Sequence, residues 1–312
     1  MPSARSSPLR RSRGPVSLRF VNRSHAAELD RIPAPALVIV AVLSVQLGAA
    51  VAKSLFDDLT PNGVVALRLV FGGIVLGLLF RPQIRNRPRA ELRLAVAFGL
   101  VLVAMNLCFF QALDRIPLGI AVTLEFIGPL GVALIGSRRS SDFLWVAMAA
   151  SGIALLAPGI GERLDAAGVA FALAAGVLWG AYILLGVRVG KAFAGPTGLV
   201  LAMGVGACVA LPLGVASAGS SLLDPALLTA GFGVAVLSSA IPWSLELEAL
   251  RRLPTHVFGV LMSLEPAIGA LVGFVVLGER LGIRAVTAIS LVVAASAGAA
   301  RGARTAPAPP DV

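Results

Sequence analysis

Long apolar segments alternate with short polar segments along nearly the whole chain after residue 31. Six windows contain no Asp, Glu, Lys or Arg, namely 32–52, 94–113, 143–161, 166–187, 192–223 and 225–245. A helix that crosses the hydrocarbon core of a bilayer needs about 20 apolar residues. The pattern therefore predicts an all-α, multi-pass membrane protein.

Proline, glycine and charge clusters divide the apolar segments into ten predicted transmembrane helices. Their spans are 33–54, 61–80, 93–112, 118–136, 143–160, 167–187, 195–216, 226–247, 255–277 and 281–300. The loops between these spans are too short to hold a further domain.

Lys and Arg residues are unevenly divided between alternate loops. With the N-terminus placed in the cytoplasm, the cytoplasmic segments hold 20 of the 26 Lys and Arg residues, whereas the outer loops hold four. Cytoplasmic loops carry such an excess of positive charge. We therefore predict a protein of the plasma (inner) membrane with both termini in the cytoplasm.

The segment 1–32 is an Arg-rich tail that we expect to be disordered, and 301–312 forms a second cytoplasmic tail. Ala50-Val51-Ala52 resembles a signal-peptidase site, but the apolar window before it exceeds the 7–15 residues of a signal h-region. We therefore expect the first helix to be retained. The N-terminal tail either binds anionic lipid or lies upstream of the true start.

An internal repeat relates the two halves of the chain. At a constant offset of 137 residues, Arg115 matches Arg252, Pro129 matches Pro266, and Asp142 is replaced by the similar Glu279. The predicted units are residues 33–160 and 167–300, with five helices each. Because five is odd, the second copy is inverted in the membrane, a plan that recurs in secondary transporters.

The segment "TLEFIGPLG" (123–131) places a carboxyl group and a proline inside an apolar span. Glu125 is costly there unless it has a partner, faces water or is protonated, and an apolar environment favours the protonated form. Pro129 lacks an N–H group and leaves the carbonyl of Glu125 without its helical donor. Both features are accounted for if they line a wet cavity. The alternative is a kink with a buried, protonated, hydrogen-bonded glutamate.

Several segments closely resemble the threonine/homoserine exporter branch of the EamA-type drug/metabolite transporters. They are "AVAKSLF" (50–56), "VALRLVFG" (65–72), "PLGIAVTLEFIGPLGVAL" (117–134), "SLELEAL" (244–250) and "LMSLEPAIGALVGFVVLGE" (261–279). The resemblance implies ten helices in two inverted repeats. It also implies export of small amino acids, driven by the proton gradient. The Arg-rich tail and the additional carboxylate of Glu248 depart from the family pattern.

Arg68 and Glu125 each lie seven residues into a span that starts at the outer face, so both are expected about 10 Å deep. A guanidinium matches a carboxylate in geometry. Arg68 could therefore bind the carboxylate of an amino acid while Glu125 binds its ammonium group. A purely structural Arg68–Glu125 ion pair accounts for the same residues.

Two of the remaining candidates, Lys53 and Glu265, each have two possible interpretations. Lys53 is either a substrate or gate contact or an interfacial anchor. Glu265 is either a second proton carrier or a structural residue beside the helix break at Pro266. Glu246 and Glu248 are interpreted as residues near the inner surface. The uncharged groups expected near the cavity are Gln46, Asn106, Gln111 and Trp179.

Other function classes fit the sequence poorly. The net charge of +10 does not indicate nucleic-acid binding, because the Arg residues lie in short loops and the tail and no binding motif is present. No metal or cofactor is expected, since neither the two cysteines nor the two histidines form a ligand set. The rivals are an exporter of other metabolites or drugs, a membrane-embedded enzyme and a channel. The expected partners are a small-molecule substrate, protons and membrane lipids; the sequence does not predict an oligomeric state.

Overall fold

The described residues of the chain are almost entirely helical. The structure, a computed structural model, describes residues 32–82, 87–135, 140–156, 164–193 and 196–302, and no strand occurs in these ranges. The predicted fold class, an all-α membrane protein, is confirmed. The predicted N-terminal tail (1–32) lies outside the described residues except for Ile32, and the C-terminal tail (301–312) except for its first two residues.

The helices follow one another with short connections. The first half contains α2 (Ala34–Ser54), α3 (Phe56–Phe80), α4 (Arg89–Leu113), α5 (Leu118–Glu125), α6 (Ile127–Ile135) and α7 (Ser140–Leu155). The second half contains α8 (Ala166–Ala192), α9 (Thr197–Ala218), the 3-10 turn η1 (Gly219–Leu223), α10 (Pro225–Ala235), the π-helical turn η2 (Val236–Ala240), α11 (Ile241–Arg252), α12 (Thr255–Met262), α13 (Glu265–Leu277) and α14 (Ile283–Gly302).

Among the described residues, seven helices are long and apolar enough to cross a membrane. Three shorter apolar helices, at Leu118–Val132, Phe143–Leu155 and Ile283–Gly298, coincide with three further predicted spans. Large apolar side chains such as Phe143 and Ile283 are exposed, as expected for helices that face lipid chains. The total of ten spans stays a prediction.

Helix interruptions occur just before three interior prolines. The fourth predicted span is divided at Phe126 into α5 and α6, three residues before Pro129. The ninth is divided at Ser263 and Leu264, the second of which lies two residues before Pro266. The π-helical turn η2 ends two residues before Pro242. Proline removes one backbone donor and its ring clashes with the carbonyl of residue i−4, so each interruption has a local cause.

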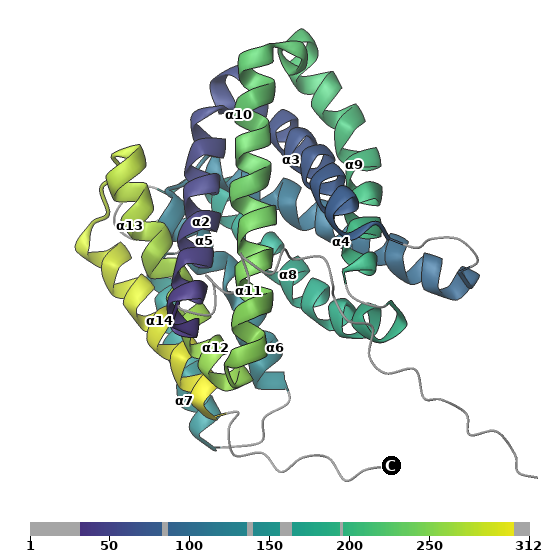
Figure 1. The fold of residues 1–312 in the computed structure, drawn as a ribbon. Coiled ribbons are helices and arrows are strands. Elements are labelled where there is room, and N and C mark those ends of the chain that lie inside the picture. Colours follow the sequence, from purple (N-terminus) through teal and green to yellow (C-terminus); the bar gives the residue numbers. More distant parts are fainter. Residues whose placement is uncertain (1–31, 83–86, 136–139, 157–163, 194–195, 303–312) are drawn as a thin grey trace, which may run out of the picture. The chain divides into compact units, whose positions relative to one another are not determined.

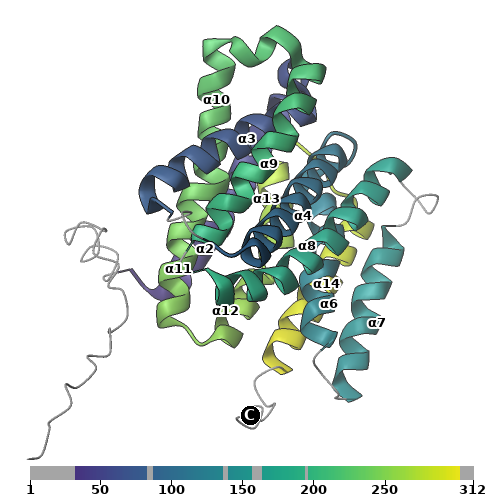
Figure 2. The same ribbon diagram turned by 90° about the vertical axis from the view of Figure 1, so that its right-hand side faces the viewer.

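Residues from the two halves of the chain pack side by side. The most extensive helix pairs are α3 with α9, α4 with α8, and α7 with α14 (Figure 2). Helix α2 lies against α11 and α13 (Figure 1). The halves therefore share one core instead of folding as separate domains.

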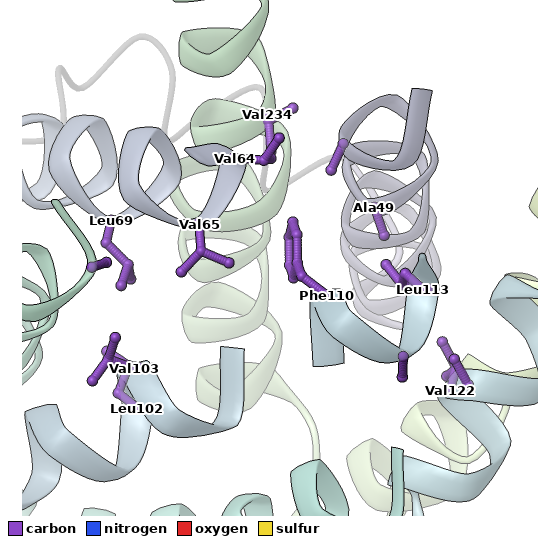
Figure 3. Close-up of a cluster of buried hydrophobic side chains, with 14 of the residues drawn as sticks. Ala49, Val64, Val65, Leu69, Leu102, Val103, Phe110, Leu113, Val122 and Val234 are labelled. Atoms are coloured by element: carbon purple, nitrogen blue, oxygen red, sulfur yellow. The ribbon is translucent and has the colours of Figure 1, made fainter. Parts of the chain in front are cut away.

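Phe110 of α4, which is 1% exposed, is one of the largest fully buried side chains of the core. Figure 3 shows its ring in a buried cluster with Val65 of α3, Ala49 of α2 and Val234 of α10. Because the cluster includes side chains from both halves, apolar packing and van der Waals contact hold them together in the interior.

The two halves come very close together where glycines of α6 and α8 meet. A Cβ atom added to Gly128 would lie 2.0 Å from the carbonyl oxygen of Gly176. A Cβ atom added to Gly176 would lie 2.7 Å from the carbonyl oxygen of Glu125. The backbone next to Glu125 therefore needs glycine in both helices, as close helix contacts in membranes commonly do.

We predict that Gly128→Ala destabilises the protein, because the new methyl group overlaps backbone atoms that cannot move aside. Overpacking of this kind costs about 1–3 kcal/mol, so the unfolding temperature of the purified protein should fall by several degrees. Unfolding is followed by differential scanning fluorimetry in detergent.

Gly131→Ala is the matched control, since Gly131 lies in the same helix and nothing lies within 4 Å of an added Cβ atom. Alanine stabilises a helix relative to glycine by about 1 kcal/mol, so the control should be neutral or stabilising. Equal unfolding temperatures for the two variants would contradict the close contact.

Candidate functional site

A cavity of about 210 Å³ lies between the two halves, far larger than the space that one water molecule needs. Four charged residues line it: Arg68, Glu125, Glu246 and Glu265. Ionisable groups inside a membrane protein typically mark substrate or ion pathways. The cavity is therefore the candidate functional site. Its uncharged polar lining residues include Gln46, Asn106, Ser238 and Ser239, with Trp179 and Tyr182 as aromatic neighbours.

Arg68 projects from α3 and is held by contacts with other helices. Its Nη1 donates to Asn106 Oδ1 at 2.6 Å, and its Nη2 donates to the Ser238 carbonyl at 3.3 Å. Asn106 is itself oriented by donating to the Leu102 carbonyl at 2.8 Å. The guanidinium also lies over the ring of Phe110, 5.5 Å from its centre. In the described residues, Arg68 Nε has no acceptor.

Glu125 is the last residue of α5 and is 8% exposed. The described part of the chain contains no salt bridge between Arg68 and Glu125, although both side chains line the same cavity. The Glu125 carbonyl, which Pro129 cannot donate to, lies against Gly176 of α8. The carboxyl group and the freed carbonyl therefore have different surroundings.

Glu265 is the first residue of α13 and contacts α2 across the two halves. Gln46 Nε2 donates to Glu265 Oε1 at 3.3 Å. Gln46 is 1% exposed and Glu265 is 7% exposed. Gln46 Oε1 and Glu265 Oε2 are buried, and neither has a hydrogen-bond donor among the described residues.

The π-helical turn η2 supplies two backbone acceptors next to the cavity. The Leu237 carbonyl accepts from Ser44 Oγ at 2.7 Å, and the Ser238 carbonyl accepts from Arg68. A wider helical turn of this kind changes the backbone pairing and is frequent at functional sites. Ser238 Oγ has no partner among the described residues.

Two of the aromatic lining residues, Trp179 and Tyr182, belong to α8 and are held by ring contacts. Trp179 packs edge-on against Phe126, with 5.5 Å between ring centres. Tyr182 stacks on Phe98 at 4.5 Å. The first contact ties α8 to the break between α5 and α6.

Two of the candidates from the sequence, Lys53 and Gln111, do not line the cavity. Lys53 Nζ donates to Glu279 Oε1 at 2.8 Å and to the Ile116 carbonyl at 2.9 Å. Glu279 Oε2 accepts from the backbone N–H of Leu118, the first residue of α5, at 2.8 Å. These groups form a network, which we call the Lys53–Glu279 network, near the end of α2.

Gln111 lies near the end of α4, where it donates to Asn62 at 3.1 Å and accepts from Arg115 at 2.7 Å. It therefore connects polar groups at a helix end. The other six polar candidates, namely Gln46, Arg68, Asn106, Glu125, Trp179 and Glu265, line one cavity.

Sequence reasoning missed Glu246, which was interpreted as a residue near the inner surface but lines the cavity. The signal was available: Ser239, Trp243 and Glu246 are spaced i, i+4, i+7 and all line the cavity, as one helix face would. Glu248 points elsewhere and pairs with Arg252 at 2.6 Å. Ser238 and Tyr182 were also missed, and no charge pattern singles them out.

The chain matches the model of the EamA-like transporter family twice, over residues 33–158 and 166–300. It is 45% identical over 266 residues to a protein of Salmonella typhimurium (strain LT2) named threonine/homoserine exporter RhtA. The alignment covers 84% of this chain and 89% of that protein. The protein of the same name from Escherichia coli (strain K12) is 44% identical with the same coverage.

One solved crystal structure superposes on 86% of this chain and 98% of its own length, with a TM-score of 0.57. Its sequence identity is 19%, so this likeness supports the fold alone. The family match excludes the membrane-enzyme alternative. This chain is a multi-pass membrane protein that belongs to the EamA-like transporter family.

Proposed function

We propose that this chain is a secondary-active exporter of small amino acids, of the threonine and homoserine kind, in the plasma (inner) membrane. The observation that carries the proposal is a cavity between the halves that is lined by a guanidinium and three carboxyl groups. The names of the relatives, at 44–45% identity over most of both chains, support the substrate class.

An amino acid zwitterion fits this set of charges. Its carboxylate matches the Arg68 guanidinium, whose planar donors suit carboxylate geometry. Its ammonium group is complementary to the carboxyl groups in the same cavity. A cationic drug would gain from the carboxyl groups but would be repelled by Arg68, so the proposal favours zwitterions over cations.

Export is coupled to protons, and Glu125 is the proton carrier in this proposal. It lines the cavity and, unlike Glu265, accepts no described side-chain hydrogen bond. The other ionisable groups on the cavity wall are Arg68, Tyr182, Glu246 and Glu265. Protonation of Glu125 changes the charge that the substrate meets, which links proton and substrate binding.

Transport occurs by alternating access between the two halves, as in other inverted-repeat transporters. The excess of Lys and Arg in the other loops assigns the Lys53–Glu279 network to the outer face. Lys53 comes from the first half and Glu279 from the second, and the network also includes the start of α5. Opening toward the outside therefore requires this network to break.

We predict that inside-out membrane vesicles with an acidic interior take up labelled L-threonine. Glu125→Gln should lower gradient-driven accumulation by about tenfold, since couplings between ligands commonly amount to 5–150-fold. The same variant should still exchange labelled for unlabelled threonine without a gradient. Filter-based uptake measures both rates.

Glu248→Gln is the control, because Glu248 pairs with Arg252 and does not line the cavity. Full gradient-driven uptake by Glu125→Gln would remove the proton role from this residue. Absence of threonine uptake by folded wild-type protein would refute amino acid export. It would favour another small metabolite as the substrate.

We also predict that Lys53→Gln opens the outer side more often. Loss of about 1 kcal/mol shifts a two-state population by about fivefold. A cysteine introduced at Ala49, on the cavity wall one turn before Lys53, reports this opening in a variant whose native Cys108 and Cys208 are replaced. Its labelling rate by a membrane-impermeant maleimide, added outside intact cells, should rise by that factor.

Glu91→Gln serves as the comparison, since it removes an ion pair at the start of α4, between Arg87 and Glu91, at 3.2 Å. Arg87 and Glu91 both belong to the first half, so labelling of the reporter should not change. A labelling rate that is the same with and without Lys53 would argue against a gating role for the network.

A further inference from the structure

Four buried polar atoms in the cavity wall have no hydrogen-bond partner among the described residues. They are Arg68 Nε, Ser238 Oγ, Gln46 Oε1 and Glu265 Oε2. All four side chains line the cavity. A buried polar atom without a partner typically costs about 1–3 kcal/mol, so four in one wall require an explanation.

These atoms form two pairs of opposite character. Arg68 Nε can only donate, and the Ser238 hydroxyl can donate. The two residues are linked, because Arg68 Nη2 donates to the Ser238 carbonyl at 3.3 Å. Gln46 Oε1 can only accept a hydrogen bond. Glu265 Oε2 can likewise only accept while the Glu265 carboxyl group is ionised. They too are linked, because Gln46 Nε2 donates to Glu265 Oε1.

Helix α2 takes part in the packing of both pairs. Gln46 lies beside Gly269 of α13, where an added Cβ atom would be 3.2 Å from Gln46 Oε1. Two residues further along α2, a Cβ atom on Gly48 would lie 2.2 Å from Ser238 Oγ. These close contacts fix the Gln46 side chain against α13 and the Ser238 side chain against α2, on the wall of the same cavity.

We propose that the two pairs are the two halves of an amino acid site. Gln46 and Glu265 bind the ammonium group, whereas Arg68 and Ser238 bind the carboxylate. An ammonium group has three donors and no acceptor, and a carboxylate only accepts, so one zwitterion supplies what all four atoms lack. This assignment rests on the proposed function, and it separates the ammonium site at Glu265 from the proton carrier Glu125.

Each subsite is tested with a fragment of threonine. The probes are L-threonine, 1-amino-2-propanol, which lacks the carboxylate, and 3-hydroxybutanoate, which lacks the amino group. The measurement is the rise in unfolding temperature of the purified, full-length protein at equal millimolar probe concentrations, since a ligand that binds the folded state stabilises it. The same scan reports whether each variant is folded.

Glu265→Gln should abolish stabilisation by 1-amino-2-propanol and leave that by 3-hydroxybutanoate unchanged. Ser238→Ala should give the opposite pattern. Each variant should need about tenfold more L-threonine for the same stabilisation, the usual effect of one charge-assisted hydrogen bond. If Glu265→Gln does not fold, Gln46→Leu tests the ammonium site in its place.

Glu246→Gln is the matched control, because it removes a different carboxyl group from the same cavity. Equal losses for the Glu246 and Glu265 variants, or equal effects of either variant on both fragments, would overturn the assignment. Threonine transport without the crossed fragment pattern would leave export standing and refute the subsites. The crossed pattern without threonine transport would leave the zwitterion site standing and refute export.

Discussion

The guanidinium of Arg68 needs hydrogen-bond acceptors inside an apolar helical protein, and the arrangement of much of the cavity wall depends on this requirement. A charged group at this depth is costly unless hydrogen bonds replace its hydration. Asn106 of α4 and the Ser238 carbonyl of η2 accept two of its hydrogen bonds, and Phe110 covers its face. The residue therefore draws together helices from both halves of the chain at the point where a ligand would bind.

Irregular backbone segments supply carbonyl groups around the cavity in addition to the polar side chains. The π-helical turn η2 presents carbonyls to Ser44 and Arg68, and the break at Phe126 places the freed carbonyl of Glu125 against Gly176. In a membrane, irregular backbone is tolerated only where protein or a watery cavity surrounds it. These interruptions lie around the cavity for that reason, and glycines such as Gly128 keep the neighbouring helices close enough to cover them.

Ion pairing at the end of α2 serves a different purpose from charge inside the cavity. Lys53, Glu279 and the backbone N–H of Leu118 satisfy one another directly, and the side chains of Lys53 and Glu279 are 24% and 12% exposed. In the cavity, by contrast, Arg68 and Glu265 each keep one buried side-chain atom that has no partner in the described part of the chain. A closed contact and an incomplete one suit a gate and a binding site respectively. The proposed function accordingly assigns the gate to the Lys53–Glu279 network and substrate binding to the cavity.

The sequence by itself determined the helical membrane fold. Long uncharged windows can satisfy their backbone hydrogen bonds in a bilayer as helices, and the prolines indicate where those helices are interrupted. It also identified Arg68, Glu125 and Glu265 as unusual, since charge inside an apolar span is rare. Only the tertiary structure decided partners. Lys53 contacts Glu279, 226 residues away, and Arg68 contacts Asn106 instead of Glu125. Equal depth does not fix which way a helix face turns; that depends on packing among helices distant in sequence.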